Sequence, residues 1–449
     1  MDGKIKRMNL SVLSLSLPIF AEVFLQMLIG NVDQFMMSRY SQEAVAAVAN
    51  ANQIMNIIIM LLVVMSTATT ILIAQYLGAQ NRDKINEVCT VSVAFNALFG
   101  AVAASIIILA RHRLFSWLGV PAEIIDDTAL YMSIVACTIP ITGAYMTFVA
   151  TFRGHSLPAV TMCIAFVMNI IHIASNWVFI FGWGPIPSMG VFGVSVSTFM
   201  SKGLGLLLII GVMYYLLPVR LSWKYVWPLR WQTLKGILNI SLPSGGETLS
   251  YQLSQTTIMR MINVLGLLVI DTKVYVYILA MFCYMYTIAL ANAAQIVVGF
   301  LIGADRDGEV SAKVWQTMFL GMAISVAITI GMYMYSNQIL SIFTTDPEVL
   351  ALGHQVLLVE ILLEIGRSVN IVMVQCLQAA GDIRTPMIVG IFGMWCCAVP
   401  LSYLFGIAWG WGLVGIWLAM AADECLRGLI FIWRWLSGRW RGRKLIAAT

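Results

Sequence analysis

The chain contains 449 residues, of which 60% are hydrophobic and only 10% charged, with a mean hydropathy of +0.88 and a net charge of +5. Soluble domains have about 45–50% apolar and about 25% charged residues, so this composition excludes a soluble globular protein and predicts a membrane protein with many spans. The small positive charge is expected to set membrane topology rather than to bind nucleic acid. The eight cysteines include no CxxC pair, which argues against a zinc site or a disulfide framework.

Apolar runs long enough to cross a bilayer occur twelve times, so we expect an all-α protein with twelve transmembrane helices. The expected helices span residues 13–37, 46–77, 88–110, 128–152, 159–181, 191–217, 236–264, 274–302, 313–335, 349–379, 386–408 and 413–436. The residues before the first run lack the small-residue cleavage site of a secretory signal, so no removable signal peptide is expected.

Lysine and arginine fall mainly on one side of these spans. Eighteen of the 26, including Lys4, Lys6 and Arg7, lie on the side of the N-terminus, four lie on the opposite side, and four fall within spans. Cytoplasmic segments of membrane proteins are enriched in Lys and Arg. We therefore expect both termini in the cytoplasm.

The second half of the chain repeats the first. Leu17-Pro18 and Glu22 recur as Leu242-Pro243 and Glu247, and Gly78-Ala79 recurs as Gly303-Ala304, all 225 residues later. Parallel repeats of six helices are a transporter architecture with a site between the halves. The expected domains are an N-lobe (1–217), an inter-lobe loop (218–235), a C-lobe (236–436) and a basic tail (437–449). Pro18 and Pro243 either kink the first helix of each lobe or mark its start.

Three carboxylates stand alone in apolar helices. Glu22 and Asp33 are eleven residues apart, which places both on one helix face, and Glu247 lies in the first helix of the second half. A charge in the bilayer costs about 2.5–3.5 kcal/mol or more and usually marks an ion or substrate path. A buried carboxylate without a cation readily binds a proton, and Na⁺ is the other candidate. The alternative for each of the three carboxylates is a non-functional, solvated side chain near a helix end.

The helix expected at 349–379 carries four polar residues on one face, Glu360, Glu364, Arg367 and Asn370. Pairing of Arg367 with Glu364 would lower the cost of both charges and leave Glu360 freer to bind a proton or a cation. A static ion pair that locks this helix in the bundle is the alternative.

Other intramembrane polar residues are expected to face the protein interior. Asn52 belongs to a polar band in the second helix, and His172 and Asn176 share one face of the fifth. Tyr277 and Met281 occupy the positions of the second-helix band in the C-half, so we expect them, with Asn52, in a substrate cavity. Interhelical hydrogen bonding is the alternative for the amides, and ordinary core packing for the methionine.

Several enzyme classes are excluded by missing motifs. The sequence has no GxxxxGK[ST] phosphate loop, so this chain alone is not an ATP-driven pump, and it has no HExxH or GxSxG pattern. We expect a protein that is not an enzyme, with no bound metal and no cofactor besides a coupling ion, H⁺ or Na⁺.

Four stretches resemble the multidrug and toxic compound extrusion (MATE) family. These are LPIFAEVFLQMLIGNVDQFMMSR, AQYLGAQNRDK, LPSGGETLSYQLSQ and LQAAGDIRTPM, in the family's order. The resemblance implies a V of two six-helix lobes that exports organic, often cationic, compounds in exchange for H⁺ or Na⁺. It also implies that Asp33 takes part in an N-lobe cation or proton site, with a similar role for Glu247.

The resemblance fails at one informative position. In the fifth helix many members of the family carry an Asn and an Asp four residues apart, where this chain has His172 and Asn176. The change removes a carboxylate, which places sodium coordination there in doubt, and adds a side chain that ordinarily titrates near neutral pH.

The expected protein is therefore a monomeric secondary-active antiporter of a bacterial cytoplasmic (inner) membrane. It would bind small organic molecules and membrane lipid, with Asp33, Glu247 and Glu360 as the principal coupling residues. A flippase for lipid-linked oligosaccharides from the same superfamily remains open, as does a major-facilitator transporter. A scaffold or membrane enzyme fits the buried acids least well.

Overall fold

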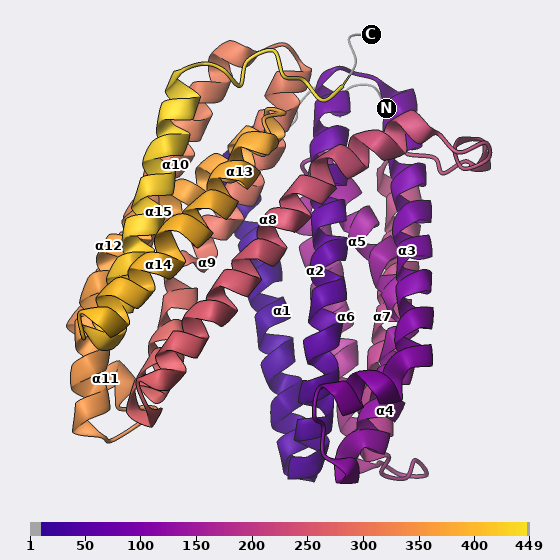
Figure 1. The fold of residues 1–449 in the computed structure, drawn as a ribbon. Helices are drawn as coiled ribbons and strands as arrows, with labels where there is room; N and C mark the ends of the chain where they lie inside the picture. Colours follow the sequence, from indigo (N-terminus) through magenta and orange to yellow (C-terminus); the bar gives the residue numbers. More distant parts are fainter. Residues whose placement is uncertain (1–9, 447–449) are drawn as a thin grey trace. The chain divides into compact units, whose positions relative to one another are not determined.

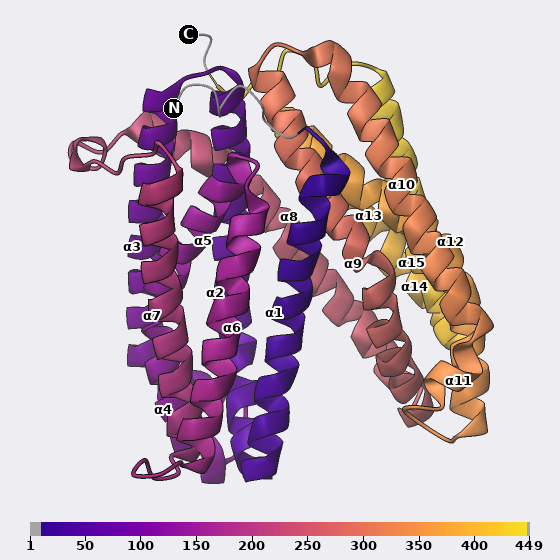
Figure 2. The same cartoon turned by 180° about the vertical axis from the view of Figure 1, so that it is seen from behind.

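The computed structural model describes residues 10–446, and within that range every regular element is helical (Figures 1 and 2). Lys4, Lys6, Arg7 and the segment considered for a signal peptide lie outside the described residues. The first half contains α1 (Val12–Tyr40), α2 (Gln42–Gly78), α3 (Arg82–Trp117), α4 (Ala122–Ala136), α5 (Ile139–Gly154), α6 (Pro158–Phe181), α7 (Gly190–Leu216) and the 3-10 turn η1 (Trp223–Tyr225).

The second half contains α8 (Trp231–Val264), α9 (Leu267–Gly303), α10 (Asp307–Met334), the short α11 (Ser336–Leu340) and α12 (Pro347–Ala379). It ends with α13 (Arg384–Gly393), η2 (Met394–Ala398), α14 (Val399–Ser402), η3 (Tyr403–Ala408) and α15 (Gly412–Leu436). The segments η2 and η3 are π-helical turns, so α13 to η3 form one interrupted helix.

Helices occupy all twelve expected runs. Within residues 10–446, nine are long and apolar enough to cross a bilayer, and the bent pair α4–α5 provides a tenth span. Helices α8 and α15 are not among these. Helix α15 carries Asp423, Glu424, Arg427 and Arg434, whose charges lower its hydropathy.

The span expected at 128–152 is broken rather than continuous. Helix α4 ends at Ala136, α5 begins at Ile139, and their axes differ by 43°. Pro140 lies in the first turn of α5, where proline is favoured because no backbone donor is needed. Gly100 of α3 packs so closely here that an added Cβ would lie 2.8 Å from the Pro140 Cα.

Pro18 and Pro243 lie inside helices and do not mark helix starts. Helix α1 begins at Val12 and α8 begins at Trp231, both well before their prolines. The alternative that these prolines open the helices is therefore wrong.

The repeat is also present in the backbone. Gln80 and Asp305 have φ angles of 57° and 59°, and Ser156 and Gly381 have φ angles of 58° and 92°. Members of each pair are 225 residues apart, and positive φ is uncommon outside glycine. The same two turns are therefore built at matching positions of both halves.

The chain divides into two compact units whose boundaries differ from the expected domains. Among the described residues, the first unit contains residues 21–241 and the second contains residues 10–20 and 242–446. Helix α1 thus changes unit next to Pro18, and α8 changes unit next to Pro243. The expected N-lobe (1–217) contained the whole of α1, whereas in the structure residues 10–20 of this region belong to the second unit.

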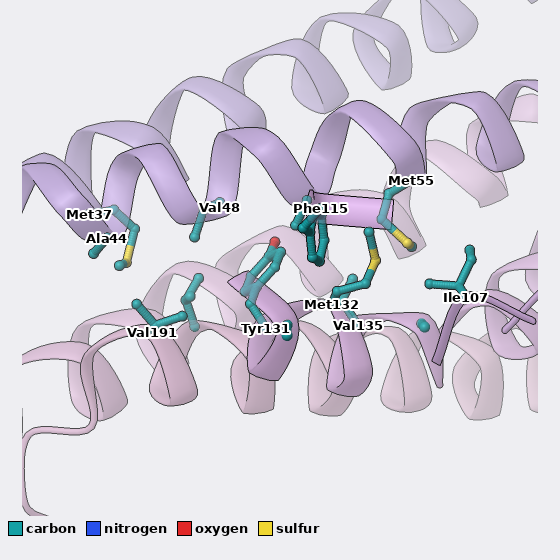
Figure 3. Packing of buried hydrophobic residues seen from close by; sticks show 14 of the residues in the cluster. Met37, Ala44, Val48, Met55, Ile107, Phe115, Tyr131, Met132, Val135 and Val191 are labelled. Atoms are coloured by element: carbon teal, nitrogen blue, oxygen red, sulfur yellow. The ribbon is translucent and has the colours of Figure 1, made fainter. Parts of the chain in front are cut away.

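Each unit has its own apolar core. In the first unit, Phe115 of α3 and Met132 of α4 are fully buried against side chains of α2 and α7 (Figure 3). In the second unit, α12 packs against α9, α10 and α15, with Val356, Leu357 and Leu363 fully buried. Helices α1 and α8 pack less closely against their neighbours than the other long helices do.

Candidate functional site

Asp33 of α1 meets two side chains of α6 in the first unit. His172 Nε2 lies 2.9 Å from Asp33 Oδ1 and 3.2 Å from Oδ2, and Asn176 Nδ2 donates to Oδ1 at 2.6 Å. The Asp33 side chain is 21% exposed and that of His172 only 7%. Asp33, His172 and Asn176 are therefore brought together in a partly buried polar cluster, which we call the Asp33 cluster.

His172 joins the Asp33 carboxylate to a hydroxyl of α7. Its Nδ1 lies 3.0 Å from Ser201 Oγ, and its Nε2 lies 2.9 Å from Asp33 Oδ1. A neutral imidazole donates from one ring nitrogen and accepts at the other, and a protonated imidazole donates from both. The ring can therefore donate from Nε2 to Asp33 in the neutral and in the protonated form.

Polar side chains of other helices lie near the Asp33 cluster. Lys202 of α7 and Tyr131 of α4 are its charged or titratable neighbours, and Tyr131 also donates to Asn52 Oδ1 at 3.3 Å. Asn176 Oδ1 is buried without a hydrogen-bond partner. The cluster has one acid, one imidazole and one unsatisfied amide oxygen.

Glu22 is neither solitary nor solvated, which corrects both expectations for it. Its side chain is 1% exposed, its Oε1 pairs with Arg153 Nη2 at 3.0 Å, and its Oε2 accepts from Thr161 at 2.8 Å. Thr161 and His172 are eleven residues apart on α6, as Glu22 and Asp33 are on α1. The two helices therefore run parallel in register, tied at two levels. Glu22 is therefore held by two fixed partners, and its coupling role stays a prediction.

We predict that Arg153→Met lowers the free energy of unfolding by roughly 3 kcal/mol, because it leaves a buried carboxylate unpaired. The double variant Glu22→Gln/Arg153→Met removes both charges and is expected to recover part of that loss. Thermal unfolding of the purified variants in detergent measures both effects. Strictly additive losses in the double variant would contradict a direct interaction between the two side chains.

Arg367 holds two acids in the second unit. The expected Glu364–Arg367 ion pair is present, but Arg367 Nη1 also donates to Glu360 Oε1 at 2.8 Å. Trp417 Nε1 donates to the other Glu360 oxygen at 2.7 Å, and the guanidinium lies 4.8 Å from the centre of the Tyr284 ring. The prediction that Glu360 is the freer acid is therefore wrong.

A second ionic group lies next to Arg367. Arg427 of α15 pairs with Asp423 at 2.7 Å and with Glu424 at 2.8 Å, and Asn370 of α12 donates to Glu424. A small pocket beside these residues is also lined by Tyr251, Gln255 and Arg367. Asn370 thus joins α12 to α15 by a hydrogen bond between helices.

Glu247, Tyr277 and Met281 lie outside these ionic groups. Glu247 is half-buried and packs against α13, where an added Cβ at Gly390 would lie 2.9 Å from Glu247 Oε1. It forms no ion pair with any other residue between 10 and 446. Tyr277 is exposed beneath Lys273 Nζ, 4.7 Å from its ring centre, and Met281 is half-buried in α9. Their place in a substrate cavity stays a prediction.

Sequence reasoning missed three partners. In the sequence, Arg153 was only one of the basic residues used to predict the membrane topology, although in the structure it forms an ion pair with Glu22. Ser201 and Trp417 fix the orientation of His172 and Glu360. Serines and tryptophans are common in membrane helices, so only the position of α7 and α15 in three dimensions identifies these two.

Two half-chain repeats of apolar helices with buried carboxylates define a polytopic membrane transporter. A model of the MatE family matches residues 18–178 and 243–404, two segments that begin 225 residues apart. The chain therefore belongs to the MatE family, the multidrug and toxic compound extrusion transporters, which are not enzymes. The resemblance seen in the sequence is confirmed, and a major-facilitator transporter is excluded.

Relatives and solved structures cover nearly the whole chain. It is 34% identical over 430 residues to the uncharacterized transporter YisQ of Bacillus subtilis, covering 96% of this chain and 94% of the relative. It is 24% identical to the probable multidrug resistance protein NorM of Thermotoga maritima, covering 97% and 94%. A structure described as MATE in the bent conformation gives a TM-score of 0.89 at 19% identity, covering 97% and 96%. A Pyrococcus furiosus transporter of the MOP superfamily gives 0.86 at 19% identity, covering 96% of each chain. The predicted twelve-helix fold class is confirmed.

Proposed function

We propose that this protein is a secondary-active antiporter that exports organic compounds in exchange for protons bound by the Asp33 cluster. The observation that carries the proposal is the contact of His172 Nε2 with the Asp33 carboxylate while Nδ1 faces Ser201. That arrangement supports proton binding, because it sets a carboxylate against an imidazole within an apolar helix bundle.

Proton binding at this cluster would change how firmly α1 is held against α6. A proton on His172 turns its hydrogen bond to Asp33 into an ion pair, and loss of that proton weakens the contact. Glu22 also ties α1 to α5 and α6, so protonation at Asp33 and His172 alters one of the two polar contacts that hold this helix. A substrate that binds one arrangement better than the other is then driven by the proton gradient.

Protons are a better coupling ion than sodium for this cluster. Sodium is bound by oxygen ligands, whereas the cluster offers a single carboxylate, one free amide oxygen and an imidazole nitrogen against Asp33. The position that would hold a second carboxylate in many family members is Asn176 here.

The substrate class is proposed from the relatives. Several of them are named as probable multidrug resistance proteins, which supports export of drugs and other cationic or amphipathic organic compounds. The excess of Lys and Arg on one side supports a bacterial cytoplasmic membrane location with both termini in the cytoplasm. We propose a monomer as the transporting form.

Transport by purified protein in liposomes tests the proposal. Ethidium movement would be followed under an imposed pH gradient and, separately, under a sodium gradient at equal pH. We expect transport under the pH gradient alone and none under the sodium gradient. Sodium-driven transport without a pH gradient, or no transport under either condition, would overturn the proposal.

A further inference from the structure

The chain that follows α15 folds back onto the second unit and is fixed there. Arg443 Nη1 donates to Asp382 Oδ1 at 2.8 Å, and Lys444 pairs with Asp305. Asp382 is fully buried. Gly381 has φ +92°, and a Cβ there would lie only 1.8 Å from the carbonyl oxygen of Arg443. Residues 437–446, which we call the tail, are therefore an ordered part of this unit.

Trp440 anchors the middle of the tail. Its side chain is 1% exposed, and its ring stacks on Trp435 with centroids 4.4 Å apart and an interplanar angle of 14°. Its Nε1 donates to the carbonyl oxygen of Trp435 at 3.0 Å. Gly438 and Gly442, with φ angles of 66° and 73°, supply the turns on either side. The backbone between them is thus held in one conformation.

Two arginines of the tail are exposed and are not used in these contacts. Arg439 lies 5.7 Å from the ring centre of Trp433, and Arg441 lies 5.5 Å from that of Trp440. Neither forms an ion pair with any carboxylate between residues 10 and 446. Trp433 is 59% exposed and Leu436 is 67% exposed. Arg439 therefore lies on an exposed indole ring at the end of α15, and Arg441 follows two residues later on the ring of the buried Trp440.

We propose that Arg439, Arg441 and Trp433 bind the headgroup of an anionic phospholipid from the surrounding bilayer. Guanidinium groups match phosphate oxygens with paired hydrogen bonds, and basic residues directly after a transmembrane helix are attracted to anionic membrane surfaces. Tryptophan rings favour the level of the headgroups. The fixed tail lowers the entropy cost of ordering the two arginines on the lipid.

Lipid binding to the purified full-length protein tests this inference. Phosphatidylglycerol or phosphatidylcholine would be titrated in detergent and counted by native mass spectrometry. Wild type is expected to bind phosphatidylglycerol more tightly than phosphatidylcholine. The double variant Arg439→Gln/Arg441→Gln is expected to lose about 25-fold in phosphatidylglycerol affinity, since each arginine near an anionic membrane surface contributes about fivefold.

A matched control removes the same charge from exposed residues of the first unit, Lys224→Gln/Arg230→Gln, and is expected to keep the tight phosphatidylglycerol site. Both variants leave Asp382 and Arg443 intact, so the tail keeps its anchors. Equal phosphatidylglycerol affinity in wild type and Arg439→Gln/Arg441→Gln would overturn the inference. So would equal affinity of wild type for the two lipids, or displacement of the lipid by millimolar inorganic phosphate, which would indicate a free-phosphate site. The assay involves no transport, so its outcome is independent of the proposed function.

Discussion

Asp33→Asn is expected to reduce efflux driven by a pH gradient to the level of membranes that lack the protein. The amide keeps the shape of the side chain and still accepts the hydrogen bond from Asn176. It cannot take up and release a proton, and it forms no ion pair with a protonated His172. Ethidium efflux from everted membrane vesicles, normalised to the amount of folded protein, measures the effect.

The neighbouring residue on α1 provides a control for the Asp33 variant. Gln34 is exposed, so Gln34→Ala is expected to transport at the wild-type rate. The melting temperature of Asp33→Asn is expected to stay within a few degrees of wild type, since an uncharged amide is no harder to bury than a carboxyl group. Wild-type efflux by a folded Asp33→Asn protein would show that the driving proton binds elsewhere.

Arg367→Met is expected to produce the largest loss of stability, about 3–5 kcal/mol in the free energy of unfolding. Arg367 neutralises Glu360 and Glu364, both of which are fully buried. Removing the guanidinium leaves two buried acids on α12, and Trp417 is then the one remaining side-chain donor to Glu360 among residues 10–446. Thermal unfolding of purified protein in detergent measures the loss.

Two further variants separate charge from packing at this position. The triple variant Glu360→Gln/Glu364→Gln/Arg367→Met removes all three charges and is expected to recover much of the stability. Arg306→Gln breaks the exposed Arg306–Glu309 pair and is expected to leave the melting temperature unchanged, because exposed ion pairs contribute little. A melting temperature of Arg367→Met equal to wild type would show that the buried acids are not held by this arginine.

Much of the fold follows from hydropathy and from the repeat. Long apolar runs locate a helix at each of the twelve positions, although α8 and α15 are less apolar than the others. The break at residues 137–138 was not foreseen, since Pro140 alone does not distinguish a kink from a new helix start. The change of unit within α1 was not foreseen either. It depends on which helices pack together, and a hydropathy profile carries no such information.

The acids of the candidate sites were identifiable, but their partners were not. Asp33 was found because a charge is rare in an apolar helix, and His172 because it shares a face with Asn176. That Arg153 pairs with Glu22, and that Trp417 donates to Glu360, depends on side chains brought close from α5 and α15. Helical spacing finds neighbours within one helix and not across a bundle.

The exchange of leading segments between the two halves bears on how such a chain arose. Residues 10–20 pack with the second unit, and residues 231–241 of α8 pack with the first. A free six-helix ancestor would expose that leading segment unless a second copy received it, as in domain-swapped dimers. Gene fusion would then have made permanent an assembly that already existed as two chains. If the chain is divided within the connecting loop and the two halves are expressed from separate genes, we therefore expect to purify them as a complex and not as single halves.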